Sequence, residues 1–585
     1  MDNILKYLSK RQWMIIAVIA VFTVAQAWFN LRLPEYMAEI TNVMAVGGGP
    51  NEVWQKGEYM LLCALGSLAV AIIIGFFASR VGASFSQRVR SLLFNKVDSF
   101  SMGEINKFSI ASLITRSTND VTNVQMIITI GLQLVIYAPV LAVWALLKIS
   151  SKNIEWTLAT GIAMAVLAMS FVAVIIAVLP KFRKMQILTD NINKVARENL
   201  MGLPVIRAYN AEGYQKDKFE KANDELTDTQ LYTTHAMALM MPFVNFIMSA
   251  LLLSIYWVGA ILISNASMLE TLPLFSDMIV FVSYAMQVMM AVVMILMLFI
   301  ILPRAQVSAK RIVEVINTEP SIRDGAVTDP DNSLKGEIEF RNVSFKYPGA
   351  ADYVLEDISF SVKQGETIAF IGSTGSGKTT LINLVPRFYD TTEGSVLLNG
   401  VDVRDYKLES LYDRIGYIPQ KSVLFSGTIT SNVAFGDSRK ENATEEDVKL
   451  AMRIAQGADF VEEMEDSYNA AVARGGTNLS GGQKQRLSIA RAIYKAPEVY
   501  IFDDSFSALD YKTDRALRTA LKKETRGVTS MIVAQRIGTI MDADKIIVLD
   551  EGRIVGAGKH KELLNKCEVY REIAMSQLSK EELAI

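Results

Sequence analysis

Six long uncharged stretches occupy the first half of the sequence and constrain its fold more than any other feature. They run from Gln12 to Leu31, Tyr59 to Ser79, Ile127 to Leu147, Trp156 to Pro180, Ala236 to Leu269 and Met278 to Pro303. Each has about 20 residues or more, the length at which an α-helix crosses the ~30 Å hydrocarbon core of a bilayer. Backbone polar groups need internal partners in lipid, which favours helices. The sequence therefore predicts six membrane-spanning helices.

Lysines and arginines flank these stretches unevenly. They precede the first stretch and crowd the connections between the second and third and between the fourth and fifth. The positive-inside rule therefore places both termini in the cytoplasm. These two connections contain few Gly or Pro and carry apolar residues at helical spacing, which predicts helices that continue beyond the membrane. Their turns, near residues 106–112 and 209–215, are candidates for docking on a cytoplasmic domain; solvated hairpins are the alternative.

Methionine recurs at helical spacing along the sixth stretch. Such a face can repack around apolar ligands, because methionine is flexible and polarizable. The candidates for a substrate cavity are Tyr284, Met286, Gln287, Met290 and Met294. Helix packing or lipid contact is the alternative interpretation of this face. Gln133 and Asn245 are further polar groups at membrane depth, where they are expected to face protein or a cavity.

The pattern changes after the sixth stretch. The loop from Thr318 to Leu334, rich in Pro, Asp and Gly, indicates a domain boundary, and short apolar runs then alternate with helical segments as in an α/β domain. We predict a multidomain chain, with a six-helix transmembrane bundle in residues 1–325 and an α/β domain in residues 326–585. The net charge of −2 argues against nucleic acid as a partner.

A glycine-rich loop follows the apolar strand that ends at Ile371. The loop and the residue after it are Gly372, Ser373, Thr374, Gly375, Ser376, Gly377, Lys378, Thr379 and Thr380. This is a P-loop, in which backbone N–H groups surround phosphate oxygens, Lys378 reaches the β- and γ-phosphates and Thr379 ligates Mg²⁺. Asp503, at the end of a later apolar strand, is the acid that orients the metal. The second domain is therefore predicted to bind ATP with Mg²⁺.

A second motif distinguishes this chain from other P-loop proteins. Between the P-loop and Asp503 lie Leu479, Ser480, Gly481, Gly482 and Gln483. With this LSGGQ segment the chain resembles the ABC transporter family, and its six spans make it similar to an exporter half-transporter. In that family two ATP-binding domains pair head to tail, and each ATP lies between one domain's P-loop and the other's LSGGQ segment. The resemblance also assigns adenine stacking to Tyr347, Mg²⁺ contact to Gln420 and the D-loop at the dimer seam to Asp510.

Two departures from the family pattern concern catalysis. Asp504 replaces the family's catalytic glutamate and is one methylene shorter; Gln535 replaces its switch histidine and cannot carry a proton. General-base geometry tolerates little displacement. The chain's own site is therefore expected to bind ATP and hydrolyse it poorly, while its LSGGQ segment serves the opposite site. A third departure is Arg474, at a position where exporters usually have a glutamate.

These departures predict a heterodimer with a second half-transporter that carries the catalytic glutamate and the switch histidine. The chain is similar in this respect to the degenerate-site subunit of bacterial heterodimeric multidrug exporters. That resemblance implies export of hydrophobic or amphipathic compounds across a bacterial plasma membrane, and the absence of a transit peptide agrees with it. Export of a peptide or a lipid stays open, as does a purely regulatory ATP-binding subunit.

Overall fold

The computed structural model describes residues 2–150, 152–267, 270–330, 334–436 and 444–578. The chain divides into two compact units: Met1–Asp98 with Ala111–Thr318, and Ser99–Ile110 with Glu319–Ile585. The division falls at Thr318, whereas the sequence led us to expect residue 325. The difference arises because the residues after Thr318 bond within the second unit, where the backbone N–H of Gly325 donates to the carbonyl oxygen of Tyr406 at 2.9 Å.

Helices make up the first unit. They are α1 (Asp2–Leu5), α2 (Lys10–Ala45), α3 (Pro50–Asp98), α5 (Ile110–Thr115), a π-helical turn (Arg116–Asp120), α6 (Val121–Ser150), α7 (Ile154–Ala208), α8 (Glu212–Ala238), α9 (Met240–Asn265) and α10 (Thr271–Asn317). Within the described residues, six helical segments are long and apolar enough to cross a membrane. The six predicted spans are thus confirmed, although residues 268–269, at the end of the fifth, lie outside the described residues.

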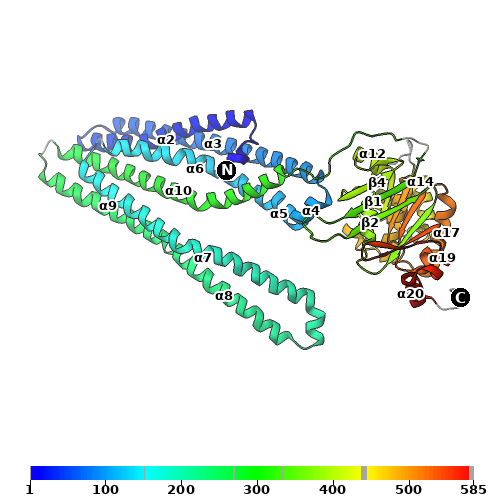
Figure 1. Ribbon diagram of the computed structural model, residues 1–585. Coiled ribbons are helices and arrows are strands. Elements are labelled where there is room, and N and C mark those ends of the chain that lie inside the picture. The colour runs from blue at the N-terminus through cyan, green and yellow to red at the C-terminus, as the bar shows by residue number, and fades with distance from the viewer. Residues whose placement is uncertain (1, 151, 268–269, 331–333, 437–443, 579–585) are drawn as a thin grey trace. The chain divides into compact units, whose positions relative to one another are not determined.

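Several of these helices are much longer than a bilayer is thick. Helix α3 has 49 residues and α7 has 55, against the roughly 20 that a span needs. Helices α7 and α8 lie side by side (Figure 1) and are joined by a short turn in which Asn210 has φ +52°. The prediction that the two cationic connections are helical is confirmed.

The membrane helices pack through apolar cores and a few polar ties. Helices α2, α3, α6 and α10 pack against one another, and α9 packs on α7 and α10. Trp156 and Phe281 are fully buried between α7 and α10, with ring centroids 5.3 Å apart. At the end of α10, the Arg116 guanidinium donates to the carbonyl oxygen of Arg311 at 2.7 Å and pairs with Glu314 at 2.8 Å. This contact anchors the π-helical turn to α10.

The described residues of the second unit form three sheets; strands β1, β2 and β4 are labelled in Figure 1. The six-stranded sheet has the order β12-β11-β3-β10-β9-β6, the four-stranded sheet β2-β1-β4-β5 and the small sheet β7-β8. The strands are β1 (Ile338–Phe345), β2 (Leu355–Val362), β3 (Thr367–Gly372), β4 (Glu393–Leu398), β5 (Val401–Asp402), β6 (Ile415–Ile418), β7 (Gly427–Thr428), β8 (Ala471–Val472), β9 (Val499–Asp503), β10 (Thr529–Val533), β11 (Lys545–Asp550) and β12 (Arg553–Gly558).

Short helices surround these sheets. They are α4 (Met102–Phe108), α11 (Lys378–Asn383), α12 (Leu408–Asp413), α13 (Ile429–Val433), α14 (Glu445–Ile454), α15 (Ala458–Glu462), α16 (Gly481–Tyr494), α17 (Tyr511–Glu524), α18 (Ile537–Ile540), α19 (His560–Lys566) and α20 (Glu568–Gln577), with 3₁₀ turns at Ser467–Asn469 and Arg474–Gly476. The predicted fold class, a six-helix membrane domain followed by an α/β domain, is confirmed.

The carboxyl ends of β3, β9 and β10 meet at one edge of the six-stranded sheet. The three strands are parallel, and Val533 on β10 pairs with Phe370 on β3 and with Asp503 on β9. Parallel strands leave the sheet at a common edge, where ligands of open α/β sheets bind. The P-loop, Asp503, Asp504 and Gln535 are thereby brought together, although they are far apart in the sequence.

Candidate functional site

The P-loop connects β3 to α11. Gly377 precedes the helix with φ +95°, and a Cβ at this position would lie 2.7 Å from Leu355 Cδ2, so the turn requires glycine. Lys378 Nζ donates to the carbonyl oxygens of Gly372 at 2.9 Å and Ser373 at 2.7 Å. These bonds hold the ammonium against the loop. A glycine-rich loop that carries a lysine and leads into a helix N-terminus is the phosphate-binding element of P-loop proteins, so phosphate binding stays the predicted role of this loop.

Thr379 and Asp503 form the predicted metal position. The Thr379 hydroxyl donates to Asp503 Oδ1 at 2.9 Å. A hydroxyl and a carboxylate oxygen are ligands that Mg²⁺ prefers, so this pair fits the ion. When bound, Mg²⁺ neutralises charge on the phosphates. Burial raises the pKa of Asp503, and the hydrogen bond from Thr379 opposes that shift.

Tyr347 lies in an aromatic cluster beside the P-loop helix. Its ring makes T-shaped contacts with Phe345 and Tyr389, at centroid distances of 5.0 and 5.2 Å. Its hydroxyl is 2.9 Å from Thr380 Oγ1 on α11. These contacts hold the ring next to the P-loop helix, and its role in stacking on adenine stays a prediction.

Removal of the Tyr347 ring is expected to weaken ATP binding. Stacking of a base on an aromatic ring is worth ~1–3 kcal/mol, so Tyr347→Ala should raise the Kd for ATP by about tenfold. Tyr347→Phe retains the ring and loses only the hydroxyl bond to Thr380, so it should bind within about threefold of the parent. Equilibrium binding of a fluorescent ATP analogue measures both. Equal affinity in the alanine variant and the parent would contradict the stacking role.

Asp504 and Gln535, the two departures from the family pattern, contact each other. Gln535 Nε2 donates to Asp504 Oδ2 at 2.8 Å, and Gln420 Nε2 donates to the same oxygen at 3.2 Å. A carboxylate oxygen has two lone pairs, so these two amides occupy both acceptor sites of Oδ2. Asp504 also has φ +47°, in the left-handed region, where Asp is found more often than most residues. The carboxylate is therefore held by neighbouring side chains.

Opposing influences act on the pKa of the Asp504 carboxyl. Burial raises the pKa of its carboxyl, while hydrogen bonds from Gln420 and Ser507 and the charges of Lys378 and Arg536 oppose the shift. Burial likewise lowers the pKa of Lys378, and the carboxylates of Asp504 and Asp503 oppose that change. Lys378 and each carboxylate thus stabilise one another's charged forms, whereas the charge of Asp504 raises the pKa of Asp503.

The LSGGQ segment forms the start of α16. Leu479 is buried, whereas Ser480 caps the helix: the Gln483 N–H donates to Ser480 Oγ at 3.3 Å, and the Ser480 N–H donates to Gln483 Oε1 at 2.8 Å. A Cβ added at Gly481 would meet no atom within 4 Å. The first turn of α16 therefore presents exposed backbone N–H groups, which suit an anion.

Asp510 and Arg474 also lie at the ends of helical turns. Asp510 caps α17 by accepting from the Thr513 N–H at 3.0 Å, and this bond lowers the pKa of its carboxyl. Arg474 is exposed in a 3₁₀ turn. Their predicted roles, at a dimer seam and in transmission between domains, stay predictions.

The first predicted docking turn belongs to the second unit and contacts the rest of it. Asn106 Nδ2, on α4, donates to the Tyr389 hydroxyl at 3.2 Å, and the Ser321 N–H donates to Glu104 Oε1 at 3.3 Å. Tyr389 in turn packs on Tyr347. A chain of contacts therefore leads from this predicted docking turn to the ring beside the P-loop. The turn at residues 209–215 lies in the first unit.

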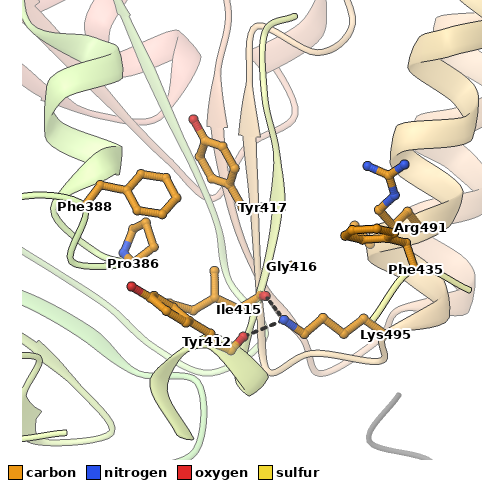
Figure 2. A pocket seen from close by; sticks show the side chains of 10 residues that line it. Pro386, Phe388, Tyr412, Ile415, Gly416, Tyr417, Phe435, Arg491 and Lys495 are labelled. Carbon is orange, nitrogen blue, oxygen red and sulfur yellow. Dashed lines mark hydrogen bonds between the residues drawn. The ribbon is translucent and has the colours of Figure 1, made fainter. Parts of the chain in front are cut away.

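A groove of about 280 Å³ lies on the second unit, and Figure 2 shows the side chains that line it. Its lining residues are Pro386, Phe388, Tyr412, Ile415, Gly416, Tyr417, Phe435, Arg491, Ala492 and Lys495. Tyr417 lies on β6, shortly before Gln420, so the groove borders the segment that contacts Asp504. Sequence reasoning missed both this groove and Tyr389, because the aromatic residues involved come from segments far apart in the chain.

The five candidates for a substrate cavity occupy different environments. Tyr284 is buried, and its hydroxyl bonds to the Leu31 carbonyl oxygen and to Glu35, each at 3.0 Å. Gln287 Nε2 donates to the Asn30 carbonyl oxygen at 3.3 Å. Met290 is exposed and Met286 is partly buried, while Met294 lines a cavity among α2, α3, α6 and α10. Gln133, noted only as a polar group at membrane depth, lines the same cavity.

Comparisons with known proteins agree with this architecture. Residues 15–292 match the model of the ABC transporter transmembrane region, and residues 355–507 match that of the ABC transporter ATP-binding domain. An ABC transporter ATP-binding protein of Mycobacterium tuberculosis is 37% identical over 96% of each chain. An ATP-dependent lipid A-core flippase of Pseudomonas fluorescens is 32% identical over 85% of this chain and 81% of its own length.

A solved structure of a bacterial Atm1-family ABC exporter with ATP bound superposes with a TM-score of 0.79 and 23% identity, covering 97% of this chain and 99% of that one. At this identity the likeness concerns the fold. The sequence matches extend across both units, and the chain contains the six spans, the P-loop and the LSGGQ segment. The chain therefore belongs to the ABC transporter family, as an exporter half-transporter with a transmembrane domain fused to an ATPase domain.

Proposed function

We propose that this chain is one half of a heterodimeric exporter in which its own P-loop site binds ATP but turns it over slowly. The observation that carries the proposal is the contact among Asp504, Gln535 and Gln420. Attack by water needs a base within hydrogen-bond reach of it. Aspartate is shorter than glutamate, and one of its oxygens is engaged by two amides here. Gln535 can orient a phosphate but cannot accept a proton.

The intact LSGGQ segment supports the second part of the proposal. Its first turn is capped and exposed, with open space beside Gly481. A partner with the catalytic glutamate and the switch histidine would place its ATP against this turn. One site of the pair would then hydrolyse ATP and reset the transporter, while the other keeps the domains in contact. Closure would pass to the membrane helices through the turns at residues 106–112 and 209–215.

We further propose that the complex exports hydrophobic or amphipathic compounds across a bacterial plasma membrane, with both termini in the cytoplasm. The six spans and the cation-rich connections support this topology. The similarity to a protein named as a lipid A-core flippase favours an amphipathic lipid as a second candidate substrate, beside drug-like compounds.

Purification of the chain from its native membrane tests the heterodimer. The expected result is recovery of a second half-transporter with Glu and His at the positions of Asp504 and Gln535. ATP turnover of the pair should exceed that of the isolated chain by about 100-fold or more, the usual contribution of a positioned general base. An isolated chain that forms a homodimer with transport-coupled ATPase activity would overturn the proposal.

The contact between Asn106 and Tyr389 is expected to contribute to coupling. Asn106→Ala and Tyr389→Phe each remove this hydrogen bond, which is worth ~0.5–1.5 kcal/mol. Each should lower the amount of substrate moved per ATP by about two- to tenfold, with little change in ATP affinity. Transport into proteoliposomes, divided by phosphate released, gives the ratio. An unchanged ratio in both variants would show that α4 contacts the ATPase domain without transmitting its closure.

A further inference from the structure

The cavity that Met294 lines has an unusual composition for membrane depth. It has a volume of about 360 Å³ and is bounded by Thr23, Gln26, Ala71, Ile74, Gln133, Leu134, Tyr137 and Met294. Helices α2, α3 and α6 each contribute residues three or four positions apart, which share a helix face. This volume lies within the range of small-molecule sites, about 300–1,000 Å³. Four of the eight lining residues carry a polar group on the side chain, and the other four are apolar.

Two amides in this cavity have unused hydrogen-bonding capacity. Gln26 and Gln133 line the cavity with partly exposed side chains, for which no hydrogen-bond partner is found among the residues that the structure describes. A polar group in the hydrocarbon region that lacks a partner costs several kcal/mol. Intramembrane polar residues of this kind are usually retained for function. Both amides are therefore free to hydrogen-bond to a molecule that enters the cavity.

A short hydrogen-bond chain leaves the Tyr137 hydroxyl able to donate. Ser67 Oγ donates to Asn30 Oδ1 at 2.7 Å, and Asn30 Nδ2 donates to the Tyr137 hydroxyl oxygen at 2.6 Å. The phenol accepts from Asn30, so its own proton remains for another acceptor. The Thr23 hydroxyl donates to the Ile19 carbonyl oxygen at 2.7 Å, so its oxygen can still accept a hydrogen bond. The cavity thus offers both donors and acceptors.

None of the described residues that line the cavity is charged. Arg32 and Glu35 follow Gln26 on α2, and Glu35 pairs with Arg32 at 2.6 Å and with Lys148 of α6 at 2.7 Å, so these charges compensate one another. An ionised ligand would have no counter-charge in the cavity and would lose its hydration, which is costly in the membrane interior. The lining therefore favours a ligand that is neutral but rich in amide or hydroxyl groups.

We propose that this cavity binds the polar, uncharged part of an amphipathic substrate, such as a carboxamide or a polyol, with its apolar body against Ile74, Leu134 and Met294. The inference rests on the proposed export function and names the substrate class. Gln26 and Gln133 supply paired amide contacts and Tyr137 donates from its hydroxyl. Acids and quaternary cations of equal chain length are excluded.

Photo-crosslinking tests the site in the full chain, reconstituted in lipid nanodiscs without nucleotide. The probe is decanamide carrying a diazirine on its alkyl chain, with labelled peptides identified by mass spectrometry. We expect labelling on α2 and α6, with competition by decanamide about tenfold stronger than by decanoate or decyltrimethylammonium at equal membrane concentration. This tenfold ratio corresponds to the loss of one or two hydrogen bonds.

Variants separate hydrogen bonding from simple partitioning into the bilayer. Gln26→Leu with Gln133→Leu should reduce labelling about tenfold, and Tyr137→Phe about threefold. Asn245→Leu, which removes an amide from α9, is the matched control and should label like the parent. Equal competition by all three compounds, preference for an ion, or undiminished labelling of the double variant would each overturn the proposal.

A transport assay with ATP, on the paired transporter in proteoliposomes, distinguishes failure of this site from failure of the export function. ATP-dependent movement of a substrate by the paired transporter, together with absence of selective labelling, would refute the site alone. Selective labelling without any ATP-dependent movement would refute export and leave the binding site standing.

Discussion

Gly481→Asp is expected to abolish ATP turnover by the paired transporter, lowering kcat by about 100-fold or more, as loss of one preorganised donor site does in other enzymes. In the proposed dimer, the first turn of α16 faces the γ-phosphate bound by the partner. A carboxylate there repels the phosphate and blocks the backbone N–H groups. The variant should still fold, because a Cβ at Gly481 meets no atom within 4 Å and Asp is favourable in a first helical turn. Phosphate release by the purified pair measures the effect.

The informative control is a P-loop variant of the same chain. Lys378→Met weakens phosphate binding at the chain's own site, which the proposal treats as nearly silent. It should lower turnover of the pair by less than about tenfold, through weaker closure of the domains. If Lys378→Met proved as damaging as Gly481→Asp, both sites would have to hydrolyse ATP, and the asymmetric model would fail.

Asp504→Glu combined with Gln535→His is expected to raise ATP turnover of the isolated chain by about tenfold or more, since a correctly placed general base contributes ~10²–10⁴-fold. Both changes are needed for a physical reason. Gln535 donates to Asp504 Oδ2 at 2.8 Å, so a longer carboxylate alone would still be restrained by the amide. The histidine alone would lack a base that reaches the water. We therefore expect non-additive effects, with each single variant close to the parent.

The left-handed backbone at position 504 means that the stability of the Asp504→Glu variants has to be measured beside their activity. Asp504 has φ +47°, and glutamate tolerates this region less well than aspartate. The thermal unfolding temperature of each variant should therefore be measured with its ATP turnover. Asp504→Asn, which has the same shape as the parent side chain, is the control for turnover. Asp504→Asn should leave turnover of the isolated chain almost unchanged, because the proposal assigns Asp504 little activity. A large loss of turnover in this variant would show that Asp504 already acts as the base.

The sequence alone determined the parts of this protein whose signals are local. Span length, flanking cations and strand–loop–helix context identified six membrane helices and a P-loop ATPase domain, because each depends on consecutive residues. It also identified Asp504 and Gln535 as replacements within recognised motifs. The domain boundary was expected at residue 325 and lies at Thr318, since a loop's composition does not reveal the long-range bonds that attach it to one unit.

Only the tertiary structure decided which of these residues act together. Asp504, Gln535 and Gln420 share one oxygen because β6, β9 and β10 leave a parallel sheet at the same edge. The polar cavity needed four helices to align, and it includes Met294 while Tyr284 is buried against Leu31 and Glu35. Helical periodicity specifies which residues share a face of one helix. The neighbours of that face are set by the packing of other helices, which periodicity does not encode.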